Sequence, residues 1–450
     1  MLDWLIVGGG PHGIHLGVCL IDRGVPLDRL AVLDPNAEPL ARWSHHTENV
    51  GMSHLRSPEV HNLGVSPFSL GEHAHSNSFM ATRREQGEED SADEPDFIPP
   101  YSRPSLRLFM HHVQSLVEDS GLMRTWKLGR ADSIHKIAGG YRVESEAGEK
   151  LEAKNVVLAL GIGDQLALPS WATDFKARNR PSGIHHIFSS DFRREEIDRS
   201  DDVVIVGAGI SAAQLALALL EINPKRRITI ISRHFLKKED FDSDPGWLGP
   251  TLLEKFHAEK DYEKRREMIR EARIKGSLAS EVMQHFQNAI LHQGSIRWEM
   301  AEIERASEAQ GQRVRLEIFP FELDEAEYGE TGEISYRLGA KAQSLEADTV
   351  VLATGFEARR PGGALVDEAI ERMGLPTAKD GFPIVDHHLR WQEGLFVMGP
   401  LAELEVGPVA RNISGARMAA ERIISSPAVE RSVVKSPVSI QGHLFNPTAR

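Results

Sequence analysis

The chain has 450 residues, of which 41% are hydrophobic and 26% are charged, so it is long enough for two or three globular domains with ordinary cores. Its formal net charge of −14 argues against a nucleic-acid binder, which normally has a basic balance. Cys19 is the only cysteine, which excludes an intrachain disulfide and a Cys-x-x-Cys redox pair and leaves a buried apolar role as the expectation.

Targeting and membrane segments are not expected. The first apolar run, at residues 4–7, begins almost at Met1 and leaves no room for a signal peptide. No apolar run approaches the ~18 residues that a membrane span requires. We therefore expect a cytoplasmic protein without a membrane partner.

The first glycine-rich turn, Gly-Gly-Gly-Pro-His-Gly at residues 8–13, follows that apolar run directly. The first glycine permits a tight turn, the second lets the backbone approach a pyrophosphate, and the third lets helix and strand pack closely. Asp34 ends the next apolar run and follows Gly13 by 21 residues, close to the ~20 expected for a carboxylate that bonds a ribose hydroxyl. This order predicts a site for FAD or NAD, with a glycine turn in an unrelated α/β domain as the alternative. The residues expected to hold the dinucleotide are Gly8, Gly10, Pro11, His12, Gly13 and Asp34.

The second glycine-rich turn, at residues 207–212, has Ala212 in place of the third glycine. The next apolar run, at residues 228–231, is followed by Arg233 where a 2′-hydroxyl acceptor would stand. Arginine pairs with a 2′-phosphate and a carboxylate would repel one, so NADPH is favoured over NADH. The residues expected to hold NADPH are Gly207, Gly209, Ser211, Ala212, Ser232, Arg233 and His234.

These signals predict an α/β fold with two Rossmann-like domains, the second inserted into the first. Strand-like runs at residues 348–356 and 395–400, and a helix that begins near Pro408, are expected to complete the first domain. The predicted FAD-binding domain therefore comprises residues 1–198 and 345–450. The predicted NADPH-binding domain comprises residues 199–344, with a helical insertion at about 245–292.

The order of the two turns, together with Asp-x-x-x-Leu-Ala-Thr-Gly-Phe-x-x-x-x-Pro at residues 348–361, resembles the class B flavin-dependent monooxygenases. Within them the chain is most similar to the N-hydroxylating lysine and ornithine monooxygenases. It departs from them at Phe356, where that group has Tyr, at Ser53, where it has Gln, and at Arg56, in a region where it has a substrate-binding Lys. Further cofactor-binding residues implied by the resemblance are Arg42, Trp43, Met52, Thr354, Gly355, Gly399 and Val409.

The resemblance implies an oxidoreductase, an FAD- and NADPH-dependent monooxygenase. NADPH would reduce FAD, and the flavin would form a hydroperoxide with O2 that oxygenates a small nucleophilic substrate, by N-hydroxylation of an amine or amino acid. His54, Arg56 and Asn412 are the candidate catalytic residues, and no metal is expected. Two alternatives stay open: an NADPH-dependent flavoprotein reductase or dehydrogenase without oxygen insertion, and a non-enzymatic redox-sensing protein. The identity of the substrate and the choice between monomer and homo-oligomer also stay open.

Overall fold

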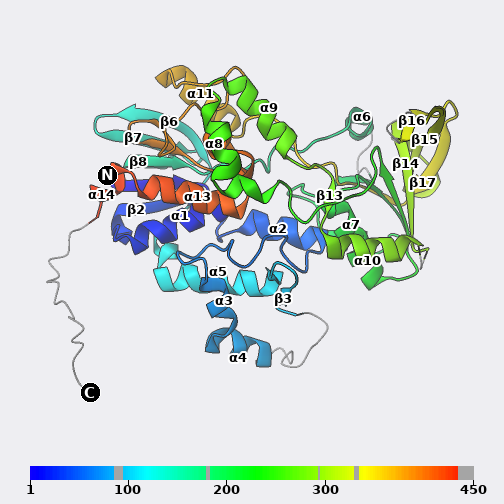
Figure 1. Ribbon diagram of the computed structural model, residues 1–450, viewed down its shortest axis with the longest axis horizontal. Coiled ribbons are helices and arrows are strands. Elements are labelled where there is room, and N and C mark those ends of the chain that lie inside the picture. Colours follow the sequence, from blue (N-terminus) through cyan, green and yellow to red (C-terminus); the bar gives the residue numbers. More distant parts are fainter. Residues whose placement is uncertain (86–94, 179–182, 292–293, 329–333, 434–450) are drawn as a thin grey trace.

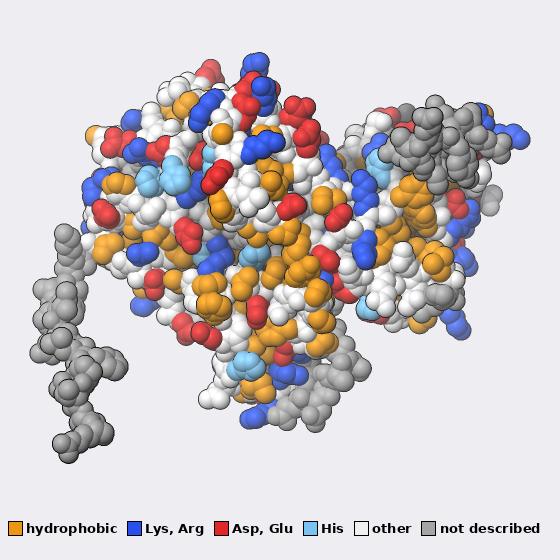
Figure 2. Space-filling view, viewed as in Figure 1, with side chains coloured by type: hydrophobic (Ala, Val, Ile, Leu, Met, Phe, Trp, Pro, Cys, Tyr) orange, Lys and Arg blue, Asp and Glu red, His pale blue; other side chains and the backbone are white. Residues whose placement is uncertain are grey.

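Two lobes, each built on a twisted sheet with flanking helices, make up the computed structural model (Figure 1), which describes residues 1–85, 95–178, 183–291, 294–328 and 334–433. The prediction of an α/β fold with two Rossmann-like units is confirmed. Figure 2 shows the same two lobes, with acidic and basic side chains interspersed over the visible face. Within the described ranges, no helix combines the length and the apolar character that a membrane crossing requires.

The sheet of the larger lobe has the strand order β19-β20-β8-β1-β2-β5, with the β6-β7 hairpin attached to β8 through β7. Pairing is parallel from β20 to β5, and the central strand β1 is almost wholly buried and apolar, as parallel strands covered on both faces are. The strands are β1 (Leu2–Val7), β2 (Leu30–Asp34), β5 (Trp126–Leu128), β6 (Ala131–Ile137), β7 (Gly140–Ser145), β8 (Lys150–Leu158), β19 (Arg390–Gln392) and β20 (Leu395–Val397).

The helices around this sheet come from both ends of the chain. They are α1 (Pro11–Asp22), α2 (Ala41–Val50), α3 (Ser69–Ala74), α4 (Asn77–Glu85), α5 (Leu106–Ser120), α11 (Gly363–Met373), α12 (Glu403–Val406), α13 (Ile413–Ile424) and α14 (Pro427–Glu430). A small hairpin of β3 (Phe97–Ile98) and β4 (Arg103–Pro104) precedes α5.

The sheet of the smaller lobe has the order β16-β15-β14-β11-β10-β18-β9, with β17 paired to β15. Its strands are β9 (Ile184–His186), β10 (Asp202–Val206), β11 (Arg227–Ser232), β14 (Ile296–Glu308), β15 (Val314–Tyr328), β16 (Ile334–Leu338), β17 (Gln343–Ala347) and β18 (Thr349–Leu352). Its helices are α6 (Ser170–Arg178), α7 (Ile210–Ile222) and α10 (Ser280–Leu291), and β12 (Lys237–Lys238) and β13 (Ser277–Leu278) form a separate pair.

The expected boundaries at 198/199 and 344/345 do not follow the two sheets. Strand β18, assigned above to the first domain, pairs in parallel with β10 and β9 in the second sheet. A buried apolar run satisfies either sheet, so its composition cannot tell which one it joins. We propose instead that the division falls near Leu166 and Phe356, and residues 434–450 of the predicted first domain lie outside the described ranges.

The chain passes between the lobes near Leu166 and again near Phe356, and these two crossings lie side by side. Leu166 and Phe356 form an antiparallel bridge. The backbone N–H of Ala167 donates to the carbonyl of Gly355 at 3.0 Å, and the Thr354 hydroxyl donates to the carbonyl of Ala167 at 2.5 Å. These bonds make the crossings a two-stranded connection.

The predicted helical insertion divides between the two lobes. Helix α10 packs in the core of the smaller lobe, whereas α8 (Pro250–Ala258) and α9 (Tyr262–Ala272) bury Phe256 and Ile269 in the core of the larger one. Figure 1 accordingly shows α8 and α9 on the larger lobe. The expectation of one insertion belonging to the second domain is therefore wrong for α8 and α9.

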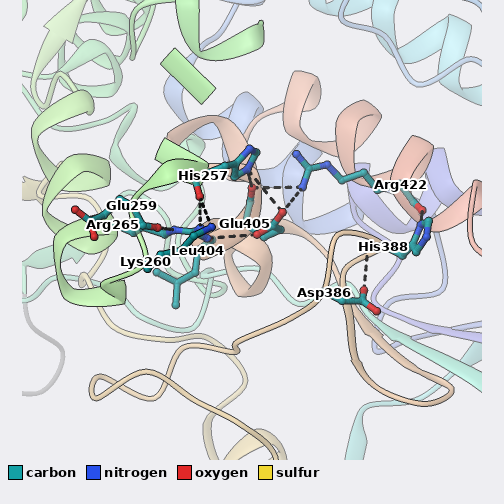
Figure 3. A network of polar contacts seen from close by, with 9 residues as sticks. All are labelled: His257, Glu259, Lys260, Arg265, Asp386, His388, Leu404, Glu405 and Arg422. Carbon is teal, nitrogen blue, oxygen red and sulfur yellow. Dashed lines mark hydrogen bonds and ion pairs between the residues drawn. The ribbon is translucent and has the colours of Figure 1, made fainter. Parts of the chain in front are cut away.

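An ion-pair network around Glu405 fastens α9 to the C-terminal helices (Figure 3). The guanidinium of Arg265 donates to the Leu404 carbonyl at 2.8 Å and lies 3.4 Å from the Glu405 carboxylate. Arg422 approaches the same carboxylate at 3.1 Å, and His257 bonds the Glu405 carbonyl at 2.8 Å. Two arginines on one carboxylate thus hold α9 against α12 and α13.

Candidate functional site

A cavity of about 1080 Å³ lies along the carboxyl ends of the parallel strands of the first sheet. Its lining begins beside β2 and β5, with Asp34 and residues 129–132, and continues past Gly8 and Gly10 to Pro400, Val409 and residues 411–414. Strand β1 has β2 on one side and β8 on the other, so the order of the strands reverses at the glycine turn. Ligands of open α/β sheets bind at such a switch point.

The first glycine turn has the geometry that a dinucleotide needs. Gly8 has a φ of +114°, and a Cβ on it would lie 2.5 Å from the Ala159 carbonyl oxygen. A Cβ on Gly13 would lie 1.9 Å from the Gly8 carbonyl oxygen, so helix α1 packs on the turn too closely for any side chain. By contrast, a Cβ on Gly10 would meet nothing within 4 Å. The protein itself needs the first and third glycines, and the second leaves open space on the cavity side.

The acid at the end of β2 faces the same cavity. One carboxylate oxygen of Asp34 accepts the N–H of Gly9 at 2.7 Å, and the other accepts the N–H of Asn36 at 2.8 Å. The oxygen that binds Asn36 also accepts that residue's side-chain N–H at 2.9 Å, so the lone pair left for a ligand hydroxyl is on the oxygen that binds Gly9. The ring of Trp126 covers Gly9, and its Nε1 donates to the Asn36 carbonyl at 2.9 Å. No sequence motif identifies Trp126 as a site residue, because only the folded arrangement of the strands brings it next to Gly9.

His12 is a buried polar group whose ring lines the cavity and is 9% exposed. Neither ring nitrogen has a hydrogen bond of regular geometry within the described residues, and the one polar group that acts on the ring at close range is the Arg411 backbone. Burial and the nearby His15 lower the pKa of His12 to about 4, so the ring is neutral at pH 7 with one donor and one acceptor. Buried polar groups normally have partners, and a ligand in the cavity would supply one here.

Of the other residues expected at the flavin, four line the cavity or its rim: Arg42, Trp43, Met52 and Val409. The guanidinium of Arg42 is 2.9 Å from the Asp164 carboxylate, and the Trp43 ring packs at 5.3 Å from that of Phe109. Phe356 also lines the cavity and stacks at 5.0 Å on Phe188.

Thr354, Gly355 and Gly399 are not among the residues that line it. Thr354 and Gly355 belong to the crossing described above, and Gly399 lies behind the His12 ring. The acid of the same motif, Asp348, accepts the backbone N–H groups of Asp201 and Asp202 at 3.0 and 2.9 Å. Thr354 and Gly355 therefore build the connection between the lobes, whereas Phe356 and Arg359 of the same segment line the cavity.

The three candidate catalytic residues have different surroundings. His54 is not part of the lining, and its Nε2 bonds the Pro95 carbonyl at 2.7 Å, so its position does not suit a catalytic role. Arg56 lines the cavity but donates to the carbonyls of residues 239 and 240 and to the Ser277 hydroxyl, at 2.7–3.0 Å. Asn412 lines it too and donates to Asp242 at 3.1 Å. Arg56 and Asn412 thus hold the loop at residues 239–242, which forms part of the cavity wall.

The second glycine turn repeats the geometry of the first. Gly207 has a φ of +130°, and its Cβ would lie 2.5 Å from the Ala353 carbonyl oxygen, as Gly8 stands to Ala159. Helix α7 begins directly after Gly209, and Ala212 is fully buried, with Ser211 beside it in the first turn of the helix. None of the residues expected to hold NADPH lines the first cavity, although all of them lie in the described part of the chain.

The Arg233 guanidinium follows β11 and is exposed to solvent. The Ser232 hydroxyl donates to the His234 carbonyl and accepts the Trp298 indole N–H, both at 2.9 Å, so its hydrogen is not available to a phosphate oxygen. Arg233 is exposed, and within the described ranges it makes no hydrogen bond or ion pair. A free guanidinium at this place suits a 2′-phosphate. Among the described residues, no group of three or more His, Cys, Asp or Glu is arranged to hold a metal.

Two glycine turns of one geometry, each at the carboxyl edge of its own parallel sheet, define a protein with two dinucleotide-binding units. Residues 5–163 match the FAD-NAD(P)-binding family. Residues 130–358 match the L-lysine 6-monooxygenase/L-ornithine 5-monooxygenase family, and the chain belongs to this family.

Solved structures share the fold over almost the whole chain. Ornithine hydroxylase from Pseudomonas aeruginosa is 19% identical with a TM-score of 0.68, covering 96% of this chain and 100% of that one. Cadaverine monooxygenase from Erwinia amylovora is 17% identical with a TM-score of 0.66, covering 99% and 100%. Bacillithiol disulfide reductase from Bacillus cereus is 16% identical with a TM-score of 0.55, covering 96% and 99%.

One curated relative is the indole-3-pyruvate monooxygenase YUCCA1 of Oryza sativa subsp. japonica. It is 24% identical over 251 residues, which are 55% of this chain and 53% of that protein. The chain therefore matches about half the length of this relative.

Proposed function

We propose that the protein is an FAD- and NADPH-dependent monooxygenase that hydroxylates the nitrogen of a small amine or amino acid with O2. Membership of the lysine and ornithine monooxygenase family supports this proposal. So does the fold shared with ornithine hydroxylase and cadaverine monooxygenase, two enzymes named for amine substrates. The expected cytoplasmic location stays a prediction.

The observation that carries the FAD assignment is the cavity along the first sheet. Gly10 leaves open space on the cavity side at the N-terminus of α1, where backbone N–H groups and the helix dipole favour a pyrophosphate. The Asp34 oxygen that binds Gly9 has a lone pair left for a ribose hydroxyl, and the His12 ring lines the same space. The residues present therefore fit FAD.

The NADPH assignment is supported by the second turn. Gly207 and Gly209 repeat the first fingerprint, and the free Arg233 would bind the 2′-phosphate through charge-assisted hydrogen bonds. The proposed NADPH-binding residues thus lie in the smaller lobe, across the two crossings from the cavity.

Oxygen is the proposed electron acceptor because the chain has no thiol pair to reduce. Cys19 is the only cysteine, and burial raises the pKa of its thiol to about 12, so it is no nucleophile at neutral pH. Bound FAD would take electrons from NADPH and activate O2. Arg56 and Asn412 would hold the loop at residues 239–242 over the far end and so limit the access of water to the substrate.

The test is reconstitution with FAD followed by a panel of small diamines and amino acids. NADPH oxidation is followed by absorbance, and hydroxylated amine and hydrogen peroxide are quantified in the same samples. At least one amine should yield hydroxylated product in proportion to the NADPH consumed. NADPH oxidation that produces only peroxide with every amine favours the reductase alternative, and a protein that never binds FAD overturns both.

A further inference from the structure

The strand order assigns the two halves of FAD to the two ends of the cavity. Asp34 and residues 129–132 follow β2 and β5 on one side of the glycine turn, and Pro400 follows β20 on the other. With the pyrophosphate at the turn and the adenosine ribose at Asp34, the flavin ring extends toward Pro400 and the N-terminus of α13. This step rests on the proposed FAD site.

A buried cluster of charges stands behind that end of the cavity. The Glu403 side chain is completely buried and pairs with three arginines. Arg273 donates to it at 2.8 Å and Arg411 at 3.2 Å, and Arg266 bonds its other oxygen. Burial alone would raise the pKa of Glu403, but the charges of the arginines outweigh it and leave that pKa below its ordinary value. Glu403 is therefore ionised.

The positive charges exceed the negative ones in this cluster. Arg266 also pairs with Asp380 at 2.6 Å, so three guanidinium groups face two carboxylates and one positive charge stays unbalanced. An unbalanced charge in a buried place is costly unless another group offsets it. The other contact of Arg273 is with the Pro408 carbonyl at 3.2 Å, which leaves its charge unchanged.

Arg411 brings this excess charge to the cavity. Of the three arginines around Glu403, all within the described ranges, Arg411 alone lines the cavity. It directly precedes Asn412, the N-cap residue of α13, so the positive end of that helix dipole acts on the same place. Two independent sources of positive potential therefore meet where the flavin ring is expected.

We propose that Arg411 contacts the flavin ring and stabilises the negative charge that the ring acquires on reduction. The hydride of NADPH carries two electrons and one proton, so its transfer adds one negative charge to the cofactor and leaves NADP⁺. Glu403 fixes the guanidinium of Arg411 from behind, and Arg273 and Arg266 supply the charge that a single Arg–Glu pair would lack. The arginines that influence the reduction potential of bound FAD therefore come from α9 and its C-terminal end (Arg266 and Arg273) and from the segment before α13 (Arg411).

The test is the midpoint potential of the FAD-loaded protein and its variants, measured by spectroscopic titration against redox dyes. Arg411→Gln removes the charge and Arg411→Lys keeps it. Arg422→Gln is the matched control, since Arg422 pairs with the partly buried Glu405 at 3.1 Å but does not line the cavity. We expect Arg411→Gln to lower the equilibrium constant for reduction at least tenfold, which for two electrons is about 30 mV. Arg411→Lys and Arg422→Gln should stay within about threefold of the parent protein, a shift that the same relation puts near 15 mV.

Equal shifts in Arg411→Gln and Arg422→Gln, or no shift in either, overturn the proposal. Loss of FAD from Arg411→Gln with retention in the other two variants supports it, because the charge alone separates the two replacements at this position. Loss of FAD from both Arg411 variants marks a structural role and overturns it. Failure of the unaltered protein to bind FAD is a different result, which refutes the proposed function itself.

Discussion

Replacing Gly10 and Gly13 separately tests which glycine serves the protein and which serves the ligand. Gly10 has φ −77° and ψ −172°, which alanine adopts freely, and its Cβ would meet no atom within 4 Å. Gly10→Ala should therefore change the free energy of unfolding of the FAD-free protein by less than ~1 kcal/mol. A Cβ on Gly13 would lie 1.9 Å from the Gly8 carbonyl oxygen, so Gly13→Ala forces α1 from the turn and should cost ~1–3 kcal/mol or more.

Gly10→Ala should impair FAD binding while leaving stability almost unchanged, whereas Gly13→Ala should lower stability. The methyl group of Gly10→Ala occupies the space left for the pyrophosphate, and we expect Kd for FAD to rise at least about tenfold, or ~1.4 kcal/mol. Urea unfolding of the FAD-free proteins and fluorescence titration with FAD measure the two quantities. Unchanged FAD affinity in Gly10→Ala, or a loss of stability equal to that of Gly13→Ala, would refute the assignment of the turn.

Three further substitutions test the second site and the forces that hold the lobes. Arg233→Ala should raise the apparent KM for NADPH about tenfold or more with little effect on NADH, because it removes charge-assisted bonds worth ~1.5–3 kcal/mol; equal effects in steady-state kinetics would count against the 2′-phosphate contact. Glu405→Gln leaves Arg265 and Arg422 without their carboxylate and should lower the free energy of unfolding by ~3–5 kcal/mol in urea, whereas an unchanged value would show that the network in Figure 3 does not hold α9. Burial, with His73 and His111, lowers the pKa of His112 to about 3. Between that pH and ~6.5 the unfolded chain binds a proton that the folded chain does not, so the free energy of unfolding falls as the pH drops. His112→Asn should therefore lose ~1–2 kcal/mol less than the parent between pH 7 and pH 5, and equal losses in urea unfolding at the two pH values would contradict this account.

The sequence predicted the parts of the fold that are local. Each glycine turn lies between a buried strand and a helix, and close packing at Gly13 and Ala212 follows from neighbours within a few residues. The sheet that β18 joins could not be predicted in this way, because its apolar residues satisfy either core. The packing of α8 and α9 on the larger lobe depends on Glu405, more than 130 residues further along the chain, and no periodicity in the helices indicates that partner.

At the candidate site, too, the sequence predicts the residues of local motifs but not those that distant segments bring together. Gly10 and Asp34 carry a recognised spacing and do line the cavity. Arg411 and Glu403 carry none, since their importance comes from the unbalanced charge of a cluster assembled from distant segments. His54 lies outside the lining, because the position of a histidine near an expected flavin stretch does not determine the direction of its side chain.

Transfer of an oxygen atom from O2 to substrate nitrogen is the central claim, and isotope labelling tests it most directly. The FAD-loaded protein is supplied with NADPH, a reactive amine and ¹⁸O₂, and the product is analysed by mass spectrometry. The account predicts a hydroxylated amine that carries one ¹⁸O atom for each NADPH consumed. A product without the label, or NADPH consumption that ends only in labelled hydrogen peroxide, would contradict it.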